Sequence, residues 1–353
     1  MVQFGSAPLC TRGGMSLPLT RVLRCVGGKI PRRYWFVVLG VLLTGIPPSW
    51  AQGSRAFKIG ILTTAMSPWH TETEGFREGL KELGYVERQR VTFEARAAQG
   101  DVTRLPELVA ELVKQRPDLL YCVASPSARA CQQATDTIPV VMVGVGDPVR
   151  LGLVQSLAQP GRNITGISNL RAELAGKRLE LFKEAVPALR RVLVTYDPRE
   201  PEEREAVASA RDPARALGVT LIEHAITAPL EIEPALATLN EGGHDGILIV
   251  QSGLNLNIPG RSLEVATSKK LPTMYPHSFW SKFGALVSYG PDQDAQGRQA
   301  ARLAHRILTG TPPRELPVEL PNRIEFIVNL KTAKQLGLQV PQVILRRADR
   351  LIE

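Results

Sequence analysis

The sequence predicts an α/β protein with two lobes, each built around a parallel β-sheet. Short apolar runs rich in β-branched residues alternate with amphipathic segments of helical period from residue 57 onward. This alternation is typical of a parallel sheet covered by helices. It is interrupted near residue 169 and then resumes, which indicates a second sheet. The 353 residues are enough for two domains of ordinary size.

The first part of the alternation contains strand and helix signals in regular order. The helix over residues 74–83 carries Phe76 and Leu80 on one apolar stripe. The next helix can be capped by Asp101 or Thr103. The predicted strands are 57–62, 91–95, 119–124 and 140–145, and the predicted helices are 74–83, 101–115 and one that begins at Ser125.

The stretch from 139 to 169 is the centre of the predicted organisation. The strand over residues 140–145 is interrupted by Gly-Asp-Pro at 146–148, where Asp147 can cap the turn that follows. We expect a short helix over 151–157 and a second short strand over 164–168. A polar turn at the carboxyl end of a buried parallel strand is where ligands bind in open α/β sheets.

The second part repeats the same alternation. The helix over residues 173–189 has Leu179, Phe182, Val186 and Leu189 in register on one face. The further predicted helices are 202–217, 230–240, 262–269 and 296–308, and the predicted strands are 191–196, 220–225, 246–250, 272–275 and 285–289. Two sheets of this kind in succession predict two lobes with a cleft.

The positive charge is concentrated at the N-terminus. The chain carries 43 Lys and Arg against 34 Asp and Glu, a net charge of +9, but the first 51 residues hold six of the basic residues and no acidic one. The remainder therefore has 37 basic and 34 acidic side chains, a net of +3. Without a basic stripe, a nucleic-acid partner is not expected.

The first 51 residues have the order of an export signal. A basic segment at 29–33 precedes an apolar run of 12 residues at 35–46, which is too short to span a bilayer. Ser49-Trp50-Ala51 is a cleavage site of the small-x-small type, which makes Gln52 the mature start. We therefore predict a periplasmic protein; a retained anchor is the alternative.

Two of the four cysteines, Cys122 and Cys131, lie outside this predicted leader. An oxidising compartment allows a disulfide between them. However, Cys122 lies inside an apolar strand and Cys131 on the helix that follows. Because of these positions we expect buried free thiols, with the disulfide as the alternative.

Several short motifs follow one another along the chain. In chain order they are Gly-Phe-Arg-Glu-Gly-Leu at 75–80, Ala-Gln-Gly-Asp at 98–101, Gly-Asp-Pro-Val at 146–149, Gly-Leu-Val at 152–154, Asn-Ile-Thr-Gly at 163–166, Ser-Tyr-Gly at 288–290 and Val-Asn-Leu-Lys-Thr-Ala-Lys-Gln-Leu-Gly-Leu at 328–338. In order and spacing they resemble the bacterial ABC-transporter substrate-binding protein family of the tryptophan- and tyrosine-uptake type. The resemblance covers about residues 57–341.

The resemblance implies a fold similar to the type I periplasmic binding proteins, with two Rossmann-like lobes joined by hinge strands. Residues 164–168 and 286–289 would be crossings between the lobes, and the helix over 296–308 would return to the first lobe. The expected division is a signal peptide at 1–51, lobe 1 at 52–166 with about 291–321, and lobe 2 at 167–290 with about 322–353.

The sequence contains no constellation typical of an enzyme. The five histidines are scattered without metal-ligand spacing, and neither a Gly-x-Ser-x-Gly motif nor a P-loop occurs. Gly144-Val145-Gly146 begins like a dinucleotide fingerprint, but Val149 occupies the third glycine position. We therefore expect no enzymatic activity, no cofactor and no metal.

The candidate ligand-binding residues are polar side chains at strand ends and helix starts. Ser125 and Ser127 lie where a helix N-terminus suits a carboxylate, although they could equally be N-caps. Asp147 could accept from a ligand ammonium or only cap its turn. Trp69 could stack on a ligand. The full predicted set is Thr63, Thr64, Ser125, Ser127, Asp147, Tyr196, Gln251, Ser252, Tyr275, His277 and Asp292.

Together these features predict the exported, monomeric receptor of an ABC importer. Its partners would be a small-molecule ligand, held by hinge closure, and an ABC transporter permease. The stretch Tyr-Pro-His-Ser-Phe at 275–279 and Pro291 depart from the tryptophan-binding branch. The ligand class therefore stays open between an amino acid and another aromatic compound. A ligand-sensing module for a membrane sensor and an enzyme that uses the same cleft are the alternatives.

Overall fold

The computed structural model describes residues 55–169, 171–228, 231–242, 244–250 and 257–353. Arg55 to Glu353 form one compact unit. The predicted signal peptide, 1–51, lies outside the described residues. Within them, no helix has both the length and the apolar character that a membrane crossing needs.

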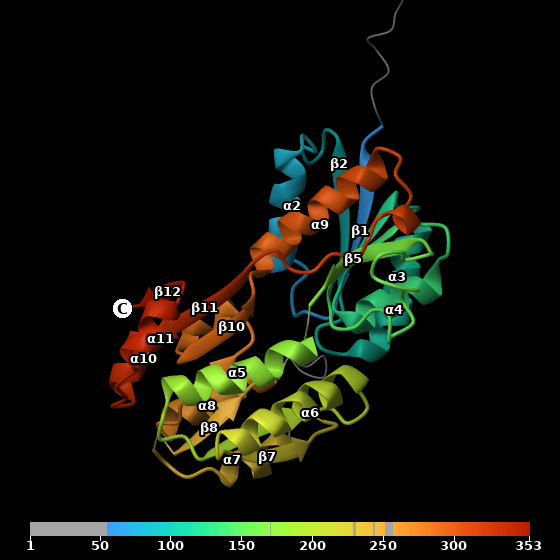
Figure 1. The fold of residues 1–353 in the computed structure, drawn as a ribbon. Coiled ribbons are helices and arrows are strands. Elements are labelled where there is room, and N and C mark those ends of the chain that lie inside the picture. The colour runs from blue at the N-terminus through green and yellow to red at the C-terminus, as the bar shows by residue number, and fades with distance from the viewer. Residues whose placement is uncertain (1–54, 170, 229–230, 243, 251–256) are drawn as a thin grey trace, which may run out of the picture. The chain divides into compact units, whose positions relative to one another are not determined.

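The first lobe is built on a five-stranded parallel sheet with the order β2-β1-β3-β4-β5 (Figure 1). Three of its strands are buried along their whole length, as the apolar runs of the sequence predict. The strands are β1 (Phe57–Thr63), β2 (Val91–Ala97), β3 (Leu119–Val123), β4 (Val140–Val145) and β5 (Ile164–Ser168).

Helices cover both faces of this sheet. Residues alternate along β3, so that Tyr121 packs with α2 and α9 while Leu120 and Cys122 pack with α3 and α4. The helices are α2 (Thr71–Glu82), the 3₁₀ turn η3 (Val102–Arg104), α3 (Leu105–Lys114), α4 (Ser125–Ala134) and α9 (Gln293–Leu308). Asp101 caps η3 by accepting from the Thr103 backbone N–H. Helix α9 packs against α2 of the first lobe, which is the position that the sequence prediction gives to the helix near residue 300.

The second lobe contains a seven-stranded sheet with the order β12-β11-β10-β9-β8-β6-β7. Its strands are parallel except for β10 and β11, which pair antiparallel. The purely parallel sheet predicted for this lobe is therefore wrong at one pair. The strands are β6 (Arg191–Tyr196), β7 (Thr220–Ala225), β8 (Asp245–Leu248), β9 (Thr273–Tyr275), β10 (Val287–Pro291), β11 (Ile324–Asn329) and β12 (Arg350–Ile352).

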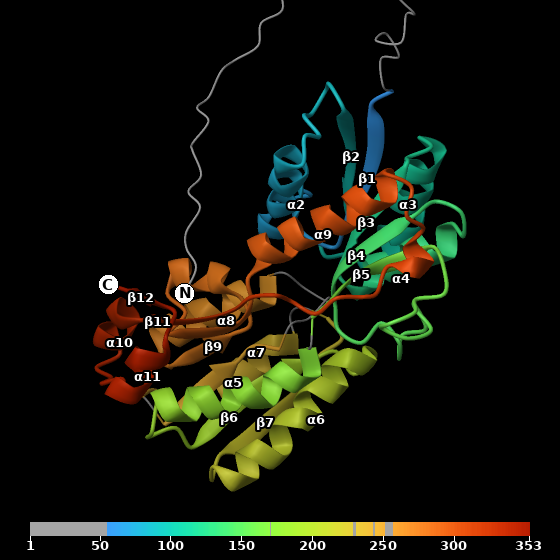
Figure 2. The ribbon, with the colours of Figure 1, turned by 45° about the horizontal axis from the view of Figure 1, so that its top comes forward.

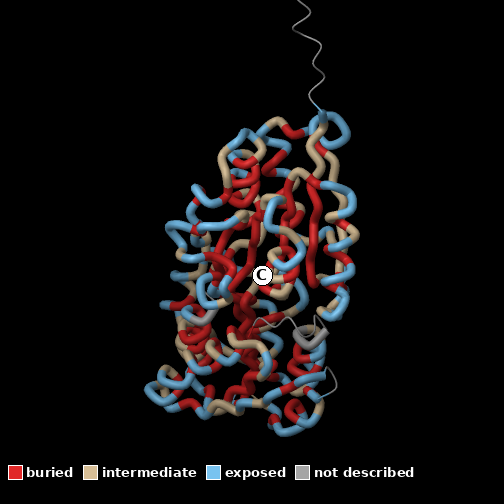
Figure 3. Tube along the Cα trace, turned by 90° about the vertical axis from the view of Figure 1, so that its right-hand side faces the viewer, coloured by how far each residue is buried: buried red, intermediate tan, exposed pale blue. Residues whose placement is uncertain are grey.

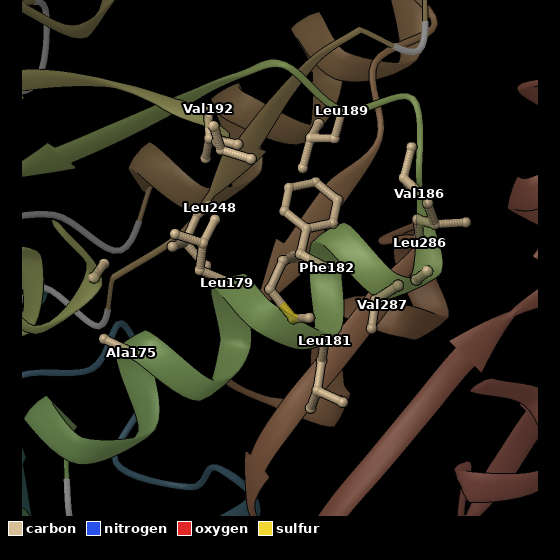
Figure 4. Packing of buried hydrophobic residues seen from close by; sticks show 14 of the residues in the cluster. Ala175, Leu179, Leu181, Phe182, Val186, Leu189, Val192, Leu248, Leu286 and Val287 are labelled. Atoms are coloured by element: carbon tan, nitrogen blue, oxygen red, sulfur yellow. The ribbon is translucent and has the colours of Figure 1, made fainter. Parts of the chain in front are cut away.

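The helices of the second lobe bury apolar stripes against that sheet. Leu179 and Phe182 point from α5 toward Val192 and Leu248 of the strands (Figure 4). Helices α5 and α6 lie side by side (Figure 2). Buried residues concentrate in the interior of the chain trace (Figure 3). The helices are α5 (Arg171–Ala185), α6 (Pro201–Ala216), α7 (Ile232–Ala237), α8 (Asn257–Ser268), η5 (Ser278–Phe283), α10 (Leu330–Gln335) and α11 (Gln342–Arg347).

The chain passes between the two sheets three times. It leaves the first sheet between β5 and α5, returns between β10 and α9, and leaves again through the segment that follows η6 (Pro313–Glu315) and leads to β11. The first and third passages run alongside each other, because Ser168 donates its backbone N–H to the Glu319 carbonyl at 2.8 Å. Segments that connect two lobes are where hinge motions of domains take place.

The helix predicted over residues 151–157 is wrong: the segment forms turns. Gly152 has a left-handed φ of +68°. The backbone N–H groups of Leu153 and Val154 both donate back to the Pro148 carbonyl. Because the segment bonds to the turn at 147–148, it has no helical ladder of its own.

The expectation of free thiols is also wrong, since Cys122 and Cys131 form a disulfide. The two residues face the same core, between the sheet and helices α3 and α4. The turn between β3 and α4 brings the strand and the helix within reach, with a Cα–Cα distance of 6.9 Å. A position within a strand therefore did not exclude the bond.

Candidate ligand-binding site

A cavity of about 500 Å³ lies where the strand ends of the two sheets face each other. Its first-lobe wall is the segment after β1, from Thr63 to Glu72, together with residues at the turn between β3 and α4. Its second-lobe wall comes from the start of α6, the end of β8 and the segment after β9. The cavity therefore occupies the position that the topology predicts for a ligand.

The β1–α2 segment is held in place by a histidine between two threonines. His70 Nε2 lies 3.2 Å from Thr63 Oγ1 and 3.1 Å from Thr73 Oγ1. Burial lowers the pKa of His70 to about 4, so its ring is neutral at neutral pH. His70 lines the cavity and supplies a polar group without a charge.

Large apolar side chains line the cavity from both lobes. Trp69 and Met66 belong to the first lobe, whereas Phe279 and Trp280 belong to the second. Trp69 is 40% exposed and Phe279 is 43% exposed, although aromatic residues usually bury more of their surface. The Arg77 guanidinium lies 4.5 Å from the centre of the Trp69 ring and supports it from one side. This wall suits a ligand with an apolar or aromatic body.

Four carboxylates also line the cavity, Glu72, Glu200, Glu202 and Glu203, and the described lining contains no lysine or arginine. Glu72, Glu202 and Glu203 lie in the first turns of their helices, a favourable position because helix N-termini stabilise negative charge. Glu202 and Glu203 are buried, and Glu203 Oε2 accepts the Asp197 backbone N–H at 2.8 Å. The polar part of the cavity therefore favours a ligand with a positively charged or hydrogen-bond-donating group.

The turn between β3 and α4 is strained where it meets the cavity. Ala124 lines the cavity and has φ 72° and ψ 158°, a region that residues with a Cβ atom rarely adopt. The Cys122–Cys131 disulfide closes a short loop around it. This turn sets the direction in which α4 starts, and so where Ser125 and Pro126 lie.

Three of the predicted residues, Thr63, Thr64 and His277, line the cavity. Ser125 lies between two lining residues, and its hydroxyl donates to Glu202 Oε2 at 2.6 Å. Ser127 is buried, and its hydroxyl has no hydrogen-bond partner within the described part of the chain.

Of the other predicted residues, the four that the structure describes in full do not line the cavity. Asp147 Oδ1 accepts the backbone N–H groups of Val149 and Arg150, both at 3.0 Å. Asp292 Oδ1 accepts the N–H of Ala295 at 3.1 Å at the start of α9. Both aspartates therefore act as caps.

The two predicted tyrosines pack against apolar clusters. Tyr196 is half-buried against the main core of its lobe, and Tyr275 is fully buried. Burial raises the pKa of Tyr275. Gln251 and Ser252 lie outside the described residues. A role of the eleven residues in ligand binding stays a prediction.

The sequence interpretation missed the acidic wall. Glu72, Glu202 and Glu203 lie in the first turns of helices that directly follow strands β1 and β6. The argument that selected Ser125 at the start of α4 also applies to these positions. No ligand-binding role was predicted for these three acids.

Residues 59–352 match the family described as ABC transporter substrate binding protein. The chain belongs to this family. The tyrosine-binding protein of Clostridioides difficile strain R20291 is 30% identical over 266 residues, which cover 75% of this chain and 76% of that protein. The family and the fold predicted from the motifs are thereby confirmed.

Solved structures agree with this ABC transporter substrate-binding protein in fold. A conserved domain protein from Vibrio cholerae has a TM-score of 0.76 at 28% identity, and the match covers 84% of this chain and 100% of that one. A domain from Streptococcus pneumoniae, solved with L-tryptophan, has a TM-score of 0.75 at 24% identity with the same coverage. The family is one of binding proteins, and its structural relatives have the same pair of α/β lobes.

Proposed function

We propose that this substrate-binding protein is the receptor of an ABC importer and that it binds its ligand in the cavity between the two lobes. The observation that carries the proposal is the origin of the cavity wall, because both lobes contribute exposed aromatic and buried acidic side chains to one space of about 500 Å³. A ligand that contacts both walls favours the closed arrangement of the lobes. The three chain passages provide the hinge.

The ligand proposed for this cavity is an amino acid with a large apolar or aromatic side chain. Trp69 and Phe279 supply aromatic surface from opposite lobes. The acidic wall suits an ammonium group, whereas the backbone N–H groups at the start of α4 suit a carboxylate. The tyrosine-binding protein of C. difficile supports this class, since it is 30% identical to the chain.

A thermal-shift assay on protein that begins at Gln52 tests the proposal. L-tyrosine and L-tryptophan, far above their dissociation constants, should stabilise the protein by about 3–4 kcal/mol. Tyramine lacks the carboxylate and 3-(4-hydroxyphenyl)propionate lacks the amine, so the two compounds report which group is needed. The absence of a shift with every large apolar amino acid would refute the proposed ligand class.

A matched pair of variants tests the position of the site. Phe279→Ala should weaken binding of L-tyrosine about tenfold, as expected for loss of an aromatic contact. Phe283→Ala is the control, because Phe283 belongs to the same 3₁₀ segment and is 59% exposed but does not line the cavity. Equal losses in the two variants would place the ligand elsewhere.

We also propose export to the periplasm through the signal peptide at 1–51, delivery to a permease, and action as a monomer. The proposed lobe boundaries are those of the sequence prediction, and the sheets to which the strands belong support them to within two residues. Mass spectrometry of the periplasmic fraction should find a mature N-terminus at Gln52. Recovery of only the uncleaved chain in a membrane fraction would support a retained anchor instead.

A further inference from the structure

Three acidic residues at the start of α6 contact the first lobe. Glu202 Oε2 accepts the Ser125 hydroxyl at 2.6 Å, and its Oε1 accepts the Asp147 backbone N–H at 3.0 Å. Glu205 pairs with Arg150 at 2.5 Å and Glu200 with Arg129 at 3.6 Å. All these contacts join the start of a second-lobe helix directly to first-lobe residues, so the contacts themselves involve no ligand atom. We call the three glutamates and their four partners the clasp.

The spacing and the charges of the clasp residues along their helices also suit this contact. Glu202 and Glu205 are three residues apart on α6, so they lie on one face of the helix. Ser125 and Arg129 are four residues apart on α4 and likewise share a face. The acids belong to a helix N-terminus, where negative charge is favourable, and their partners are arginines and hydrogen-bond donors. These residue types therefore favour contact between the start of α6 and the first-lobe residues that face it.

We propose that the clasp closes the cleft partly before any ligand binds and that Glu202 is the residue that couples closure to ligand binding. Glu202 lines the cavity and also bonds to the opposite lobe. This inference rests on the proposed function in one respect, namely that the cavity binds the ligand. If the closed state binds the ligand, the apparent affinity is proportional to the closed fraction of the unliganded protein.

The members of the clasp differ in their exposure to solvent. Glu202 is buried, so salt screens its hydrogen bonds weakly. The side chains of Arg150 and Glu205 are 55% and 38% exposed, so their pairing is weakened by salt. The closed fraction of the unliganded protein should therefore fall when the salt concentration rises from about 0.05 M to about 0.5 M. The closed fraction that remains at high salt should depend on Glu202.

The first test measures closure without ligand. Spin labels at Lys114→Cys in the first lobe and Ala237→Cys in the second, both at exposed positions, report the distribution of distances between the lobes. The parent should show a short-distance and a long-distance population. Both Glu202→Gln and Ser125→Ala should increase the long-distance population. An unchanged distribution in either variant overturns the proposal, as does a parent with no short-distance population.

The control removes a comparable ion pair that does not join the lobes. Arg211 of α6 pairs with Glu223 of β7 at 2.7 Å, and both residues belong to the second lobe. Glu223→Gln should therefore leave the distance distribution unchanged. Ser125→Ala changes only the first lobe, so it still tests the clasp if Glu202→Gln fails to fold. A shift of equal size in Glu223→Gln would show that the effect is general destabilisation and would overturn the proposal.

The second test measures affinity with L-tyrosine by calorimetry. Glu202→Gln should weaken binding about tenfold, as expected for lost hydrogen bonds to a charged group. Ser125→Ala should also weaken it, although Ser125 does not line the cavity. The fold loss of affinity in the double variant Glu202→Gln/Ser125→Ala should be smaller than the product of the losses in the two single variants. If the two fold losses simply multiply in the double variant, the effects are independent and the coupling role of Glu202 is overturned.

Failure of the clasp and failure of the proposed function give different results. If the parent binds none of the large apolar or aromatic amino acids, the proposed ligand class fails, but the distance distributions still decide whether the clasp exists. If L-tyrosine binds and the distributions of Glu202→Gln and Ser125→Ala match the parent, the receptor function stands and the clasp is wrong.

Discussion

Gly297 of α9 lies directly against the backbone of Glu72 in α2, so close that a Cβ atom at position 297 would overlap the Glu72 carbonyl oxygen. Gly75 of α2 likewise lies directly against the backbone of Asp294 in α9. Glycines on both helices therefore allow the helix axes to approach, and the helix that returns from the second lobe packs tightly on the first.

Gly297→Ala should destabilise the protein. The added methyl group must push α2 and α9 apart, which outweighs the better helix propensity of alanine, so we expect a loss of about 2 kcal/mol in unfolding free energy. Gly260→Ala in α8 is the control, because a Cβ atom there meets only ordinary contacts with Trp280 at 3.7 Å. This control should be neutral or stabilising by up to about 1 kcal/mol. Similar values from chemical denaturation of the two variants would contradict the packing argument.

Ala124→Gly should stabilise the protein. The backbone at Ala124 has φ 72° and ψ 158°, a conformation that glycine adopts without the steric cost of a Cβ atom. After the entropy cost of glycine we expect a gain of about 1 kcal/mol in unfolding free energy. Ala128→Gly, inside α4, should instead destabilise by about 1 kcal/mol. Loss of stability in both variants would show that the turn is not strained.

The disulfide predicts a chemical result and an energetic one. Denatured protein that begins at Gln52 should contain no free thiol unless it is first reduced, because Cys122 and Cys131 are paired. The double variant Cys122→Ala/Cys131→Ala should lose about 2–3 kcal/mol, since the unfolded chain is no longer constrained. Two reactive thiols in the unreduced, denatured protein would restore the expectation of free cysteines.

His70 should make stability fall in mild acid. Burial lowers its pKa from 6.5 to about 4, so the unfolded chain binds more protons than the folded protein between these values. The unfolding free energy therefore falls as pH drops from about 6.5 toward about 4. His70→Gln should remove this part of the slope. Equal slopes in the variant and the parent, from denaturation series at several pH values, would contradict the assignment.

Much of the fold was predictable because apolar periodicity is local. Phe76 and Leu80 identify α2, the run from Val140 to Val145 identifies β4, and Asp101 caps the turn before α3. The antiparallel pairing of β11 was not predictable in this way. It depends on the direction in which the chain enters the second sheet after α9, which is a property of the whole topology.

The candidate site was predictable only in part, for a related reason. The rule that ligands lie at strand ends brings Thr63, Thr64 and His277 to the cavity. It does not tell which way a side chain at a strand end points, and Tyr275 points into the core. Nor does it show that Glu202, an ordinary first-turn acid in sequence, reaches Ser125 in the other lobe.

The return of α9 to α2 also has a consequence for the order of folding. The first lobe begins at β1, near residue 57, but one wall of its core is made by residues 300–307 of α9. During synthesis the part of the second lobe from α5 to β10 must emerge before that wall exists. The two lobes therefore cannot mature one after the other from the N-terminus, and the first remains open until almost the whole chain is present.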